Sequence, residues 1–278
     1  MKLPLRLLAI DIDGTLLDPQ YQISAANLAA LRRAHRSGVE VVLVTGRRHA
    51  FAMPVAALLG FDLWLISSNG AVTRSSQGEL FHRDLLPRAT ALHLCDYMRD
   101  FRGNMVVTFD IEAKGALVLE RLDQLHASIA RWLEKNQAFI QLVTPITDAL
   151  STDPVQAMFC GAVARMKEAE ARLAAGQLGT QITVLKTQYD ARDLCMIDVL
   201  NFGCSKGHAL KRWAAHRRLE RQQIMAIGDN YNDLEMLAFA GVPFVMGNAS
   251  DDVKQSGWPV TLGNDQSGVA AALEEMGI

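Results

Sequence analysis

The sequence lacks the features that mark several large classes of protein. Its four cysteines have no CxxC spacing and no histidine cluster beside them, so buried free thiols in a reducing compartment are expected. No run approaches the roughly 20 apolar residues that a membrane-spanning helix needs. The first residues do not resemble a signal peptide, because their short apolar run is interrupted by Pro4 and Arg6 and has no small-residue cleavage site. Together these absences predict a cytoplasmic protein.

The chain also has no large excess of positive or negative charge. The formal net charge is -2, with lysine and arginine spread along the chain, so neither nucleic acid nor a membrane is expected as a partner. The densest basic stretch, 211–221, has helical spacing and is interpreted as a solvated helix face. With 278 residues, half of them hydrophobic and without repeats, the chain predicts one large globular domain or two modest ones.

In the first and last thirds of the chain, predicted apolar strands alternate with predicted amphipathic helices. Strands are expected at 5–10, 39–44, 63–67, 224–227 and 242–246. Helices are expected at 25–36, 47–59, 206–216, 234–240 and 269–276. Continuous apolar strands separated by helices predict an α/β fold, a Rossmann-like doubly wound parallel sheet covered on both faces.

The middle of the chain has a different pattern. Helices are expected at 88–100, 122–135 and 167–178, with paired β-like runs at 105–111 and 115–120 and at 182–187 and 194–199. A helix followed by two strands, repeated, is typical of an α+β domain with an antiparallel sheet. We therefore expect a core formed by 1–84 and 191–278 with an inserted domain at 85–190.

Polar residues stand where the predicted core strands end, and ligands of open parallel sheets bind at that edge. The clusters are Asp11 and Asp13 in DIDG, Thr45 and Gly46 in VTGR, Lys206 in SKG, and Asp229, Asn232 and Asp233 in GDNYND. Carboxylate oxygens suit Mg²⁺, and a phosphoryl group needs a lysine, a hydroxyl and backbone N–H groups. An ionised aspartate can also attack phosphorus, while a second carboxylate moves protons.

Each cluster alone also has an ordinary structural interpretation. DIDG and GDNYND could be turns or helix caps, VTGR a plain strand-to-helix junction, and Lys206 a surface lysine. Asn69-Gly70 is interpreted as a tight turn. The ordered occurrence of all four clusters, on both sides of an insertion, favours a shared site.

As an ordered set, these motifs resemble the haloacid dehalogenase (HAD) superfamily, and most of all the Cof-type phosphatases with an inserted type IIB cap. SSNGA at 67–71, VPFVMGNASDDVK at 242–254 and NDQSGVA at 264–270 support the resemblance. The family often carries a lysine near Ala157 and a Glu-Ile pair near Ile197-Asp198, and both are missing here. These departures bear on the substrate and leave the core chemistry untouched.

Transferred onto this sequence, the resemblance implies a role for each matched residue. Asp11 would be nucleophile and Mg²⁺ ligand, and Asp13 the general acid/base that also binds the metal through its main-chain carbonyl. Asp229 would complete the metal site, and Asp233 would support Lys206 or the metal. The phosphoryl group would be held by Thr45, Lys206 and Asn232, together with the backbone N–H groups of Ile12 and Gly46.

The implied activity is Mg²⁺-dependent hydrolysis of small phosphate monoesters through an aspartyl-phosphate. Candidate substrates are sugar phosphates, pyridoxal phosphate, flavin mononucleotide and other nucleotide or cofactor phosphates, handled by a monomer or a homodimer. A phosphomutase or phosphotransferase on the same scaffold is the alternative, although an aspartate at position 13 favours activation of water. A receiver domain or a binding module that has lost catalysis is a third interpretation, disfavoured by the large insertion and the complete set of motifs.

Overall fold

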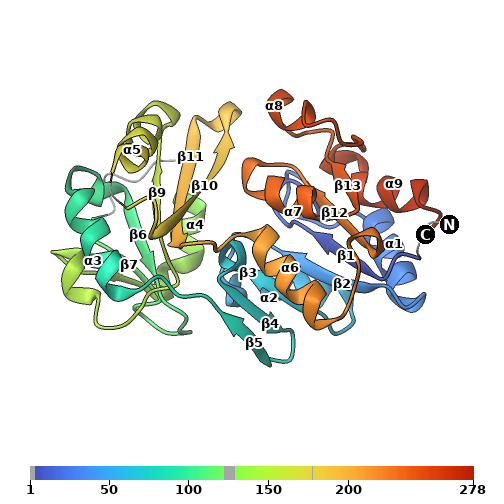
Figure 1. Cartoon of the computed structure of the whole chain (residues 1–278), viewed down its shortest axis with the longest axis horizontal. Coiled ribbons are helices and arrows are strands. Elements are labelled where there is room, and N and C mark those ends of the chain that lie inside the picture. The colour runs from blue at the N-terminus through green and yellow to red at the C-terminus, as the bar shows by residue number, and fades with distance from the viewer. Residues whose placement is uncertain (1–3, 122–128, 177) are drawn as a thin grey trace. The chain divides into compact units, whose positions relative to one another are not determined.

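The computed structural model describes residues 4–121, 129–176 and 178–278. The chain divides into two compact units (Figure 1). Unit 1 consists of Met1–Arg83 and Ser205–Ile278, and unit 2 is the intervening segment Asp84–Cys204. Unit 2 is thus inserted between the two segments of unit 1, where the predicted alternation of strands and helices changes along the sequence.

The sheet of unit 1 has the order β13-β12-β1-β2-β3-β4-β5. The strands are β1 (Leu7–Ile10), β2 (Glu40–Val44), β3 (Trp64–Ser67), β4 (Val72–Ser75), β5 (Leu80–Arg83), β12 (Ile224–Gly228) and β13 (Val242–Val245). Strands β13 to β3 pair in parallel, which confirms the predicted doubly wound core. The antiparallel hairpin of β4 and β5 was not predicted, because both strands are short and neither has a continuous apolar run.

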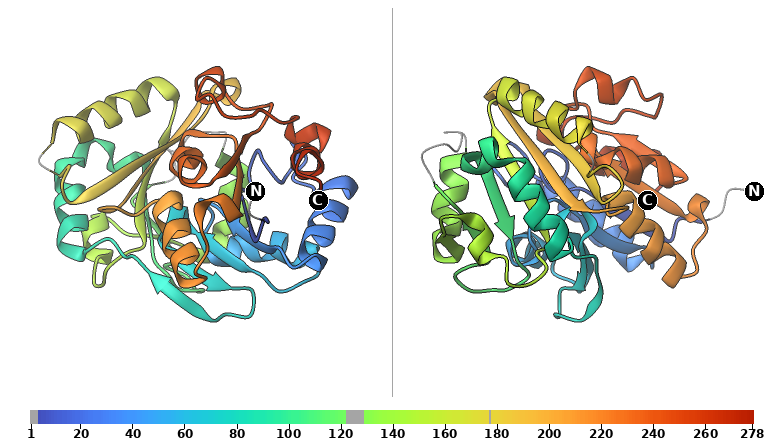
Figure 2. Two further views of the ribbon diagram at one scale, coloured as in Figure 1. Left: turned by 45° about the vertical axis from the view of Figure 1, so that its right-hand side comes forward. Right: turned by 60° about the vertical axis from the view of Figure 1, so that its left-hand side comes forward.

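Helices cover both faces of this sheet (Figures 1 and 2). The apolar side chains of α1 (Ala25–Arg36), α2 (His49–Leu59) and α9 (Gly268–Glu275) share one core cluster with β1, β2 and β3. Those of α6 (Lys206–His216), α7 (Leu234–Phe239) and α8 (Asp251–Lys254) form a second cluster with alternate residues of the same strands. Successive strand side chains therefore point into opposite layers, as a doubly wound sheet requires.

Helix α1 shows how local sequence sets these elements. The Ser24 side chain accepts a hydrogen bond from the backbone N–H of Asn27 at 3.1 Å and so caps the first turn. Ala30, Leu31 and Ala34 follow at helical spacing and are buried against the sheet. The chain then turns at Gly38 with φ at +84°, a conformation that glycine adopts without strain, and enters β2.

Unit 2 contains a sheet of order β10-β11-β9-β6-β7-β8. Its strands are β6 (Met105–Thr108), β7 (Leu117–Leu119), β8 (Ile140–Leu142), β9 (Gln156–Gly161), β10 (Ile182–Tyr189) and β11 (Leu194–Asn201). The pairing is antiparallel except between β7 and β8, which are joined through α4 (Ala130–Asn136) and run parallel. The α+β prediction describes this unit well, but it omitted β8 and β9.

The helices of unit 2 differ from their predicted ranges. Helix α3 (Arg88–Tyr97) is shorter than the expected 88–100, because a 3-10 segment at Arg99–Asn104 follows it. Helix α5 (Val163–Ala175) begins and ends earlier than the expected 167–178. Of the helix expected at 122–135, residues 122–128 lie outside the described residues, and α4 covers the remainder.

The second domain boundary lies further along the chain than the sequence suggested. The expected core segment 191–278 would include β11, but β11 pairs with both β10 and β9 inside the sheet of unit 2. The boundary therefore falls between Cys204 and Ser205, whereas the first one, expected after residue 84, falls after Arg83. An apolar strand such as β11 suits either sheet, so its composition alone could not assign it.

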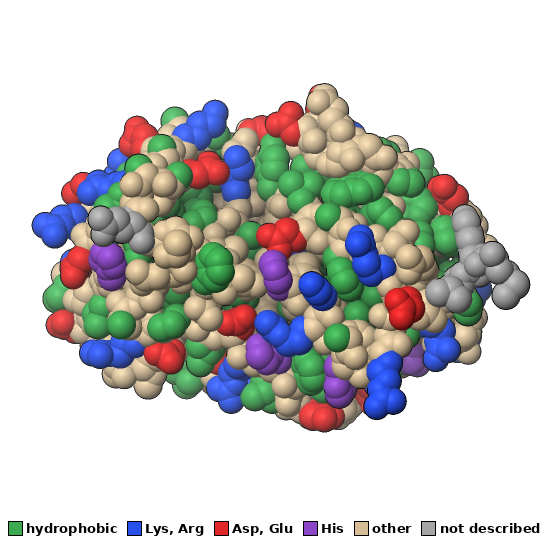
Figure 3. Space-filling model, in the orientation of Figure 1, with side chains coloured by type: hydrophobic (Ala, Val, Ile, Leu, Met, Phe, Trp, Pro, Cys, Tyr) green, Lys and Arg blue, Asp and Glu red, His purple; other side chains and the backbone are tan. Residues whose placement is uncertain are grey.

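The described residues contain no helix that is both long and apolar enough to cross a membrane. On the face drawn in Figure 3, basic and acidic side chains are interspersed. All four cysteines are buried free thiols. Burial raises the pKa of Cys95 to about 12 and that of Cys195 to about 11, so both thiols stay protonated at neutral pH.

Candidate active site

The site begins where β1 ends. The residues of β1 are fully buried, and the next backbone N–H, that of Asp11, donates to the carbonyl of Ile227 in β12 at 3.1 Å. Asp11 is only 4% exposed, while the Ile12 side chain packs into the apolar core. The chain then turns back, since the N–H of Leu17 donates to the carbonyl of Ile12 at 2.9 Å. The Asp11 carboxylate is thus fixed at the edge of the sheet.

Asp229 occupies the corresponding position after β12. Thr15, fully buried, donates its hydroxyl to Asp229 Oδ1 at 2.8 Å. Gly14 lies between, with φ at +88°, and a Cβ at this position would overlap the Asp229 carboxylate. Only glycine therefore permits the loop after β1 to approach Asp229 so closely.

Lys206 links the two halves of unit 1. It opens α6, is 1% exposed, and its Nζ donates to Asp11 Oδ1 at 2.6 Å and to Asp233 Oδ1 at 2.7 Å. Burial acts to lower the pKa of Lys206, but the two carboxylates outweigh it and leave the pKa raised. Asp233 in turn accepts the backbone N–H groups of Asp229 and Asn230 on its other oxygen, at 3.1 and 3.0 Å. The lysine is therefore a permanent buried cation.

Thr45 and Gly46 follow β2 beside a strained turn. The Thr45 hydroxyl accepts the backbone N–H of Arg47 at 3.1 Å, which leaves its own proton for another acceptor. Gly46 lies against Asn69, whose φ of +53° places its amide toward the site. Asn69 Oδ1 accepts a hydrogen bond from Asn232 Nδ2 at 2.9 Å. The expected turn at Asn69-Gly70 thus also orients a predicted phosphate ligand.

Asp13 is bound by an arginine of the segment after β2. Its carboxylate receives two hydrogen bonds of 2.6 Å from Arg47, one from Nε and one from Nη2. Asp13 and Arg47 are partly exposed, with 34% and 21% of their side chains accessible. The sequence gives no indication of this partner for Asp13.

A divalent cation fits the acidic cluster. Carboxylate oxygens of Asp11, Asp229 and Asp233 lie within 4.8 Å of one another, and all three residues are buried. Burial is the main cause that raises the pKa of Asp11 to about 7, and it also raises that of Asp229 well above its ordinary value. Buried carboxylates of this kind need a compensating positive charge beyond Lys206. Hard oxygen donors are the ligands that Mg²⁺ selects.

The structure brings most of the predicted residues together. Side chains of Asp11, Lys206 and Asp233 are hydrogen-bonded directly, and Asp229 joins them through its backbone and the acidic cluster. Thr15 and Asn69 were not predicted as members of the site, although Thr15 directly follows DIDG and Asn69 lies inside SSNGA. Asn248 is another, because its Nδ2 donates to the Gly14 carbonyl at 2.8 Å and holds the loop after β1.

A doubly wound sheet whose carboxyl edge gathers carboxylates and a buried lysine is typical of phosphoryl-transfer enzymes. A model of the haloacid dehalogenase-like hydrolases matches residues 8–273. The chain therefore belongs to this family, which confirms the resemblance inferred from its motifs.

Curated relatives carry phosphatase names. The phosphatase YwpJ of Bacillus subtilis (strain 168) is 31% identical over 299 residues, covering 98% of this chain and all of that protein. An HMP-PP phosphatase of Shigella flexneri is 30% identical over 253 residues, covering 90% of this chain and 86% of the relative. With the family, these relatives establish the chain as a hydrolase of HAD type, a phosphatase.

Solved structures agree on the fold. A haloacid dehalogenase-like hydrolase from B. subtilis superposes with a TM-score of 0.82 at 26% identity, over 98% of this chain and 100% of that chain. A subclass IIB sugar phosphatase gives a TM-score of 0.79 at 20% identity, over 98% and 99% of the two chains. The latter likeness supports the same two-unit fold and nothing finer.

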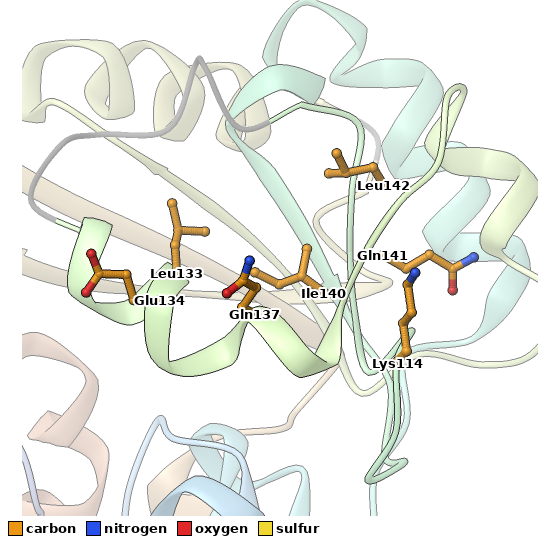
Figure 4. Close-up of a pocket in the computed structure, with 7 residues that line it drawn as sticks. All are labelled: Lys114, Leu133, Glu134, Gln137, Ile140, Gln141 and Leu142. Carbon is orange, nitrogen blue, oxygen red and sulfur yellow. The ribbon is translucent and has the colours of Figure 1, made fainter.

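Unit 2 has an open pocket of its own (Figure 4). It is lined by Lys114, Leu133, Glu134, Gln137, Ile140, Gln141 and Leu142. These residues come from α4, the 3-10 segment Gln137–Phe139, β8 and the segment between β6 and β7, and none belongs to the cluster around Asp11. The pocket is therefore a feature separate from the site of unit 1.

Proposed function

We propose that this protein is a Mg²⁺-dependent phosphatase that hydrolyses monoesters of small phosphorylated metabolites through an aspartyl-phosphate. The observation that carries the proposal is the buried Lys206, held between Asp11 and Asp233 beside Asp229. A lysine and several carboxylates at one buried point suit a ligand that is itself anionic and arrives with a cation.

The residues around Asp11 fit a magnesium ion. Asp11 and Asp229 would hold it through their carboxylates, and Asp13 through its main-chain carbonyl. Asp233 is already engaged by Lys206 and two backbone N–H groups, which supports a role in holding the site together. Held by these residues, a magnesium ion would neutralise negative charge on the phosphoryl oxygens.

The residues of the chain supply the two chemical steps. Asp11 attacks phosphorus, forming the bond from its carboxylate oxygen as the ester P–O bond breaks, and Asp13 gives a proton to the leaving oxygen. Water then attacks the aspartyl-phosphate and passes a proton to Asp13, while the acyl-phosphate P–O bond breaks and restores Asp11. Lys206, Thr45, Asn232 and the backbone N–H groups of Ile12 and Gly46 stabilise the charge of the phosphoryl oxygens during both displacements.

The substrate belongs to the class of small phosphorylated metabolites. The relative from S. flexneri is an HMP-PP phosphatase, and another from B. subtilis is a 5-amino-6-(5-phospho-D-ribitylamino)uracil phosphatase, 29% identical over 291 residues. Both names describe small phosphorylated metabolites, which supports the same class here. Ala157, near which the family often has a lysine, lies on β9 in unit 2, and Ile197-Asp198, near which it often has a Glu-Ile pair, lies on β11. These departures from the family pattern support a substrate that differs from those of the named relatives.

A rate survey tests this function. Purified protein is assayed for phosphate release from about a hundred phosphorylated metabolites, with Mg²⁺ and with a chelator. Release of phosphate from a narrow group of monoesters, dependent on Mg²⁺, is expected. Isomerised sugar phosphate without net release of phosphate would identify a mutase instead, and no turnover of any monoester would contradict the proposal.

Thermal stability should respond to magnesium more strongly as the pH rises. The pKa of Asp11 is raised from 3.8 to about 7 in the folded protein. The contribution of this group to the free energy of unfolding is therefore fully present below the pKa of the unfolded chain, and it is lost as the pH rises through about 7. Without Mg²⁺ we expect the melting temperature to fall between pH 5 and pH 8. Added Mg²⁺ should restore several degrees at pH 8 and much less at pH 5, by thermal unfolding at matched ionic strength. If Mg²⁺ raised the melting temperature equally at both pH values, the metal would not bind at these carboxylates.

Removal of the Thr15 hydroxyl should weaken magnesium binding. Thr15→Val keeps the shape of the side chain but removes the hydrogen bond to Asp229 Oδ1. Groups that orient metal ligands change affinity by about 10- to 100-fold, so the Mg²⁺ concentration for half-maximal activity should rise by that factor. Thr15→Ser, which keeps the hydroxyl, is the matched control. Equal Mg²⁺ requirements in the two variants would show that this hydrogen bond does not orient Asp229.

A further inference from the structure

Arg47 makes an unusually complete contact with Asp13. Its Nε donates to one carboxylate oxygen and its Nη2 to the other, each at 2.6 Å, which is a bidentate fork. A guanidinium in this geometry sets both the position and the plane of the carboxylate. The contact joins the loop after β1 to the segment between β2 and α2, two parts of unit 1 separated by 34 positions.

Arg47 is itself held in place. Its Nη1 donates to the carbonyl of Phe51 in the first turn of α2 at 3.4 Å, and its backbone N–H donates to the Thr45 hydroxyl at 3.1 Å. Burial works against its charge, but Asp13 outweighs this effect and the pKa of Arg47 is raised. The guanidinium therefore stays charged and anchored to the backbone at every accessible pH.

Asp13 needs such support more than the other aspartates of the site. Its side chain is 34% accessible, whereas Asp11, Asp229 and Asp233 are buried and each accepts a hydrogen bond from a buried side chain. The glycine that follows it has φ at +88°, so the adjoining backbone is a turn and not regular structure. A partly exposed carboxylate with two free torsions would otherwise sample several rotamers.

We infer that Arg47 is the positioning residue of the proton-transfer step, which rests on the proposed function of Asp13. The fork aims the Asp13 carboxylate at the leaving-group oxygen in the first step and at water in the second. Since Nε and Nη2 are engaged by Asp13, and Nη1 contacts Phe51, the recognition edge of Arg47 is directed to Asp13 and not to a second anionic group of the substrate.

The test compares leaving groups. An alkyl phosphate needs a proton on its departing oxygen, whereas p-nitrophenyl phosphate departs as a stable anion. In Arg47→Met we expect kcat for an alkyl phosphate to fall by about 30- to 100-fold, within the range that general acid catalysis supplies. For p-nitrophenyl phosphate the first step should slow by less than about fivefold, measured as the burst of nitrophenolate, with little change in KM for either substrate.

Three further variants make the outcome decisive. Asp13→Asn should show the same dependence on the leaving group, and Arg47→Met should cost little more in that background. Arg47→Lys keeps the charge but not the fork, so it should restore less than a tenth of the lost rate. Arg217→Met, which removes an exposed arginine paired with Glu40 at 2.8 Å, should leave both rates unchanged. Circular dichroism and thermal unfolding establish that each variant is folded.

The outcomes also distinguish failure of the positioning role of Arg47 from failure of the proposed phosphatase function. Equal losses with both substrates in Arg47→Met, or independent losses in the double variant, would overturn the positioning role while the dependence in Asp13→Asn still supports the proposed function. If Asp13→Asn itself shows no dependence on the leaving group, both the inference and the role of Asp13 are overturned. If Arg47→Lys retained the full wild-type rate, a positive charge alone would suffice, and the inferred role of the bidentate contact would be overturned.

Discussion

Asp11→Asn is expected to abolish turnover without unfolding the protein. Asparagine keeps the size of the side chain but cannot attack phosphorus, and removal of a nucleophile costs on the order of 10⁵- to 10⁶-fold in kcat. Because burial raises the pKa of Asp11 to about 7, its ionised form is costly in the metal-free protein near neutral pH. The melting temperature measured with a chelator should therefore be equal to that of the wild type or higher.

Two measurements make this expectation specific. Phosphate release from the best monoester of the survey gives the rate, and mass spectrometry after an acid quench detects a phosphoryl adduct on the peptide that contains Asp11. The wild type should carry the adduct and Asp11→Asn should not. Asp251→Asn is the matched control, because the Asp251 side chain is 90% exposed at the start of α8. A variant at position 11 that retained wild-type turnover would exclude Asp11 as the nucleophile.

Lys206→Met should damage both stability and catalysis. It leaves the carboxylates of Asp11 and Asp233 buried without their shared cation, and breaking a buried pair in this way costs about 3–5 kcal/mol. The free energy of unfolding by urea, measured with a chelator, should fall by that amount. Loss of a charged group that contacts the phosphoryl oxygens should also lower kcat by about 10²- to 10³-fold at saturating Mg²⁺.

A double variant separates the two effects. Lys206→Met with Asp233→Asn removes one of the stranded charges, so part of the lost stability should return while turnover stays low. If turnover recovered together with stability, Lys206 would act only as a structural counter-ion. If Lys206→Met had the stability of the wild type, the two short contacts of its ammonium group would carry no net energy.

The site was predictable to the extent that it lies at strand ends. Asp11, Thr45 and Asp229 follow apolar strands of a parallel sheet, and the carboxyl edge of such a sheet brings their positions together whatever the detailed packing. Lys206 was predictable through its motif alone, since a lysine in the first turn of a helix is ordinarily exposed. Its burial depends on Asp11 and Asp233, which are 195 and 27 positions away.

The parts that could not be predicted depend on side-chain pairs between distant segments. Asn69 and Asn232 are 163 positions apart, and no periodicity relates them. Likewise, the bidentate contact of Arg47 with Asp13 joins side chains 34 positions apart, and no pattern in the sequence relates them. The assignment of β11 failed for a related reason, because hydrophobic pattern identifies a strand but not the sheet that it joins.

The strand order of unit 1 has a consequence for biosynthesis. Strand β1 lies between β2 and β12, and its residues pair with partners some 30 and more than 200 positions away. During translation β12 emerges only after all of unit 2, so the helix–strand repeats of unit 2 can fold while β1 still has one open edge. Thr15 meets Asp229 across 214 positions, so the proposed magnesium site is complete only after most of the chain has been synthesised. Chains truncated before Lys206 and Asp229 would thus carry the proposed nucleophile without the partners that surround it.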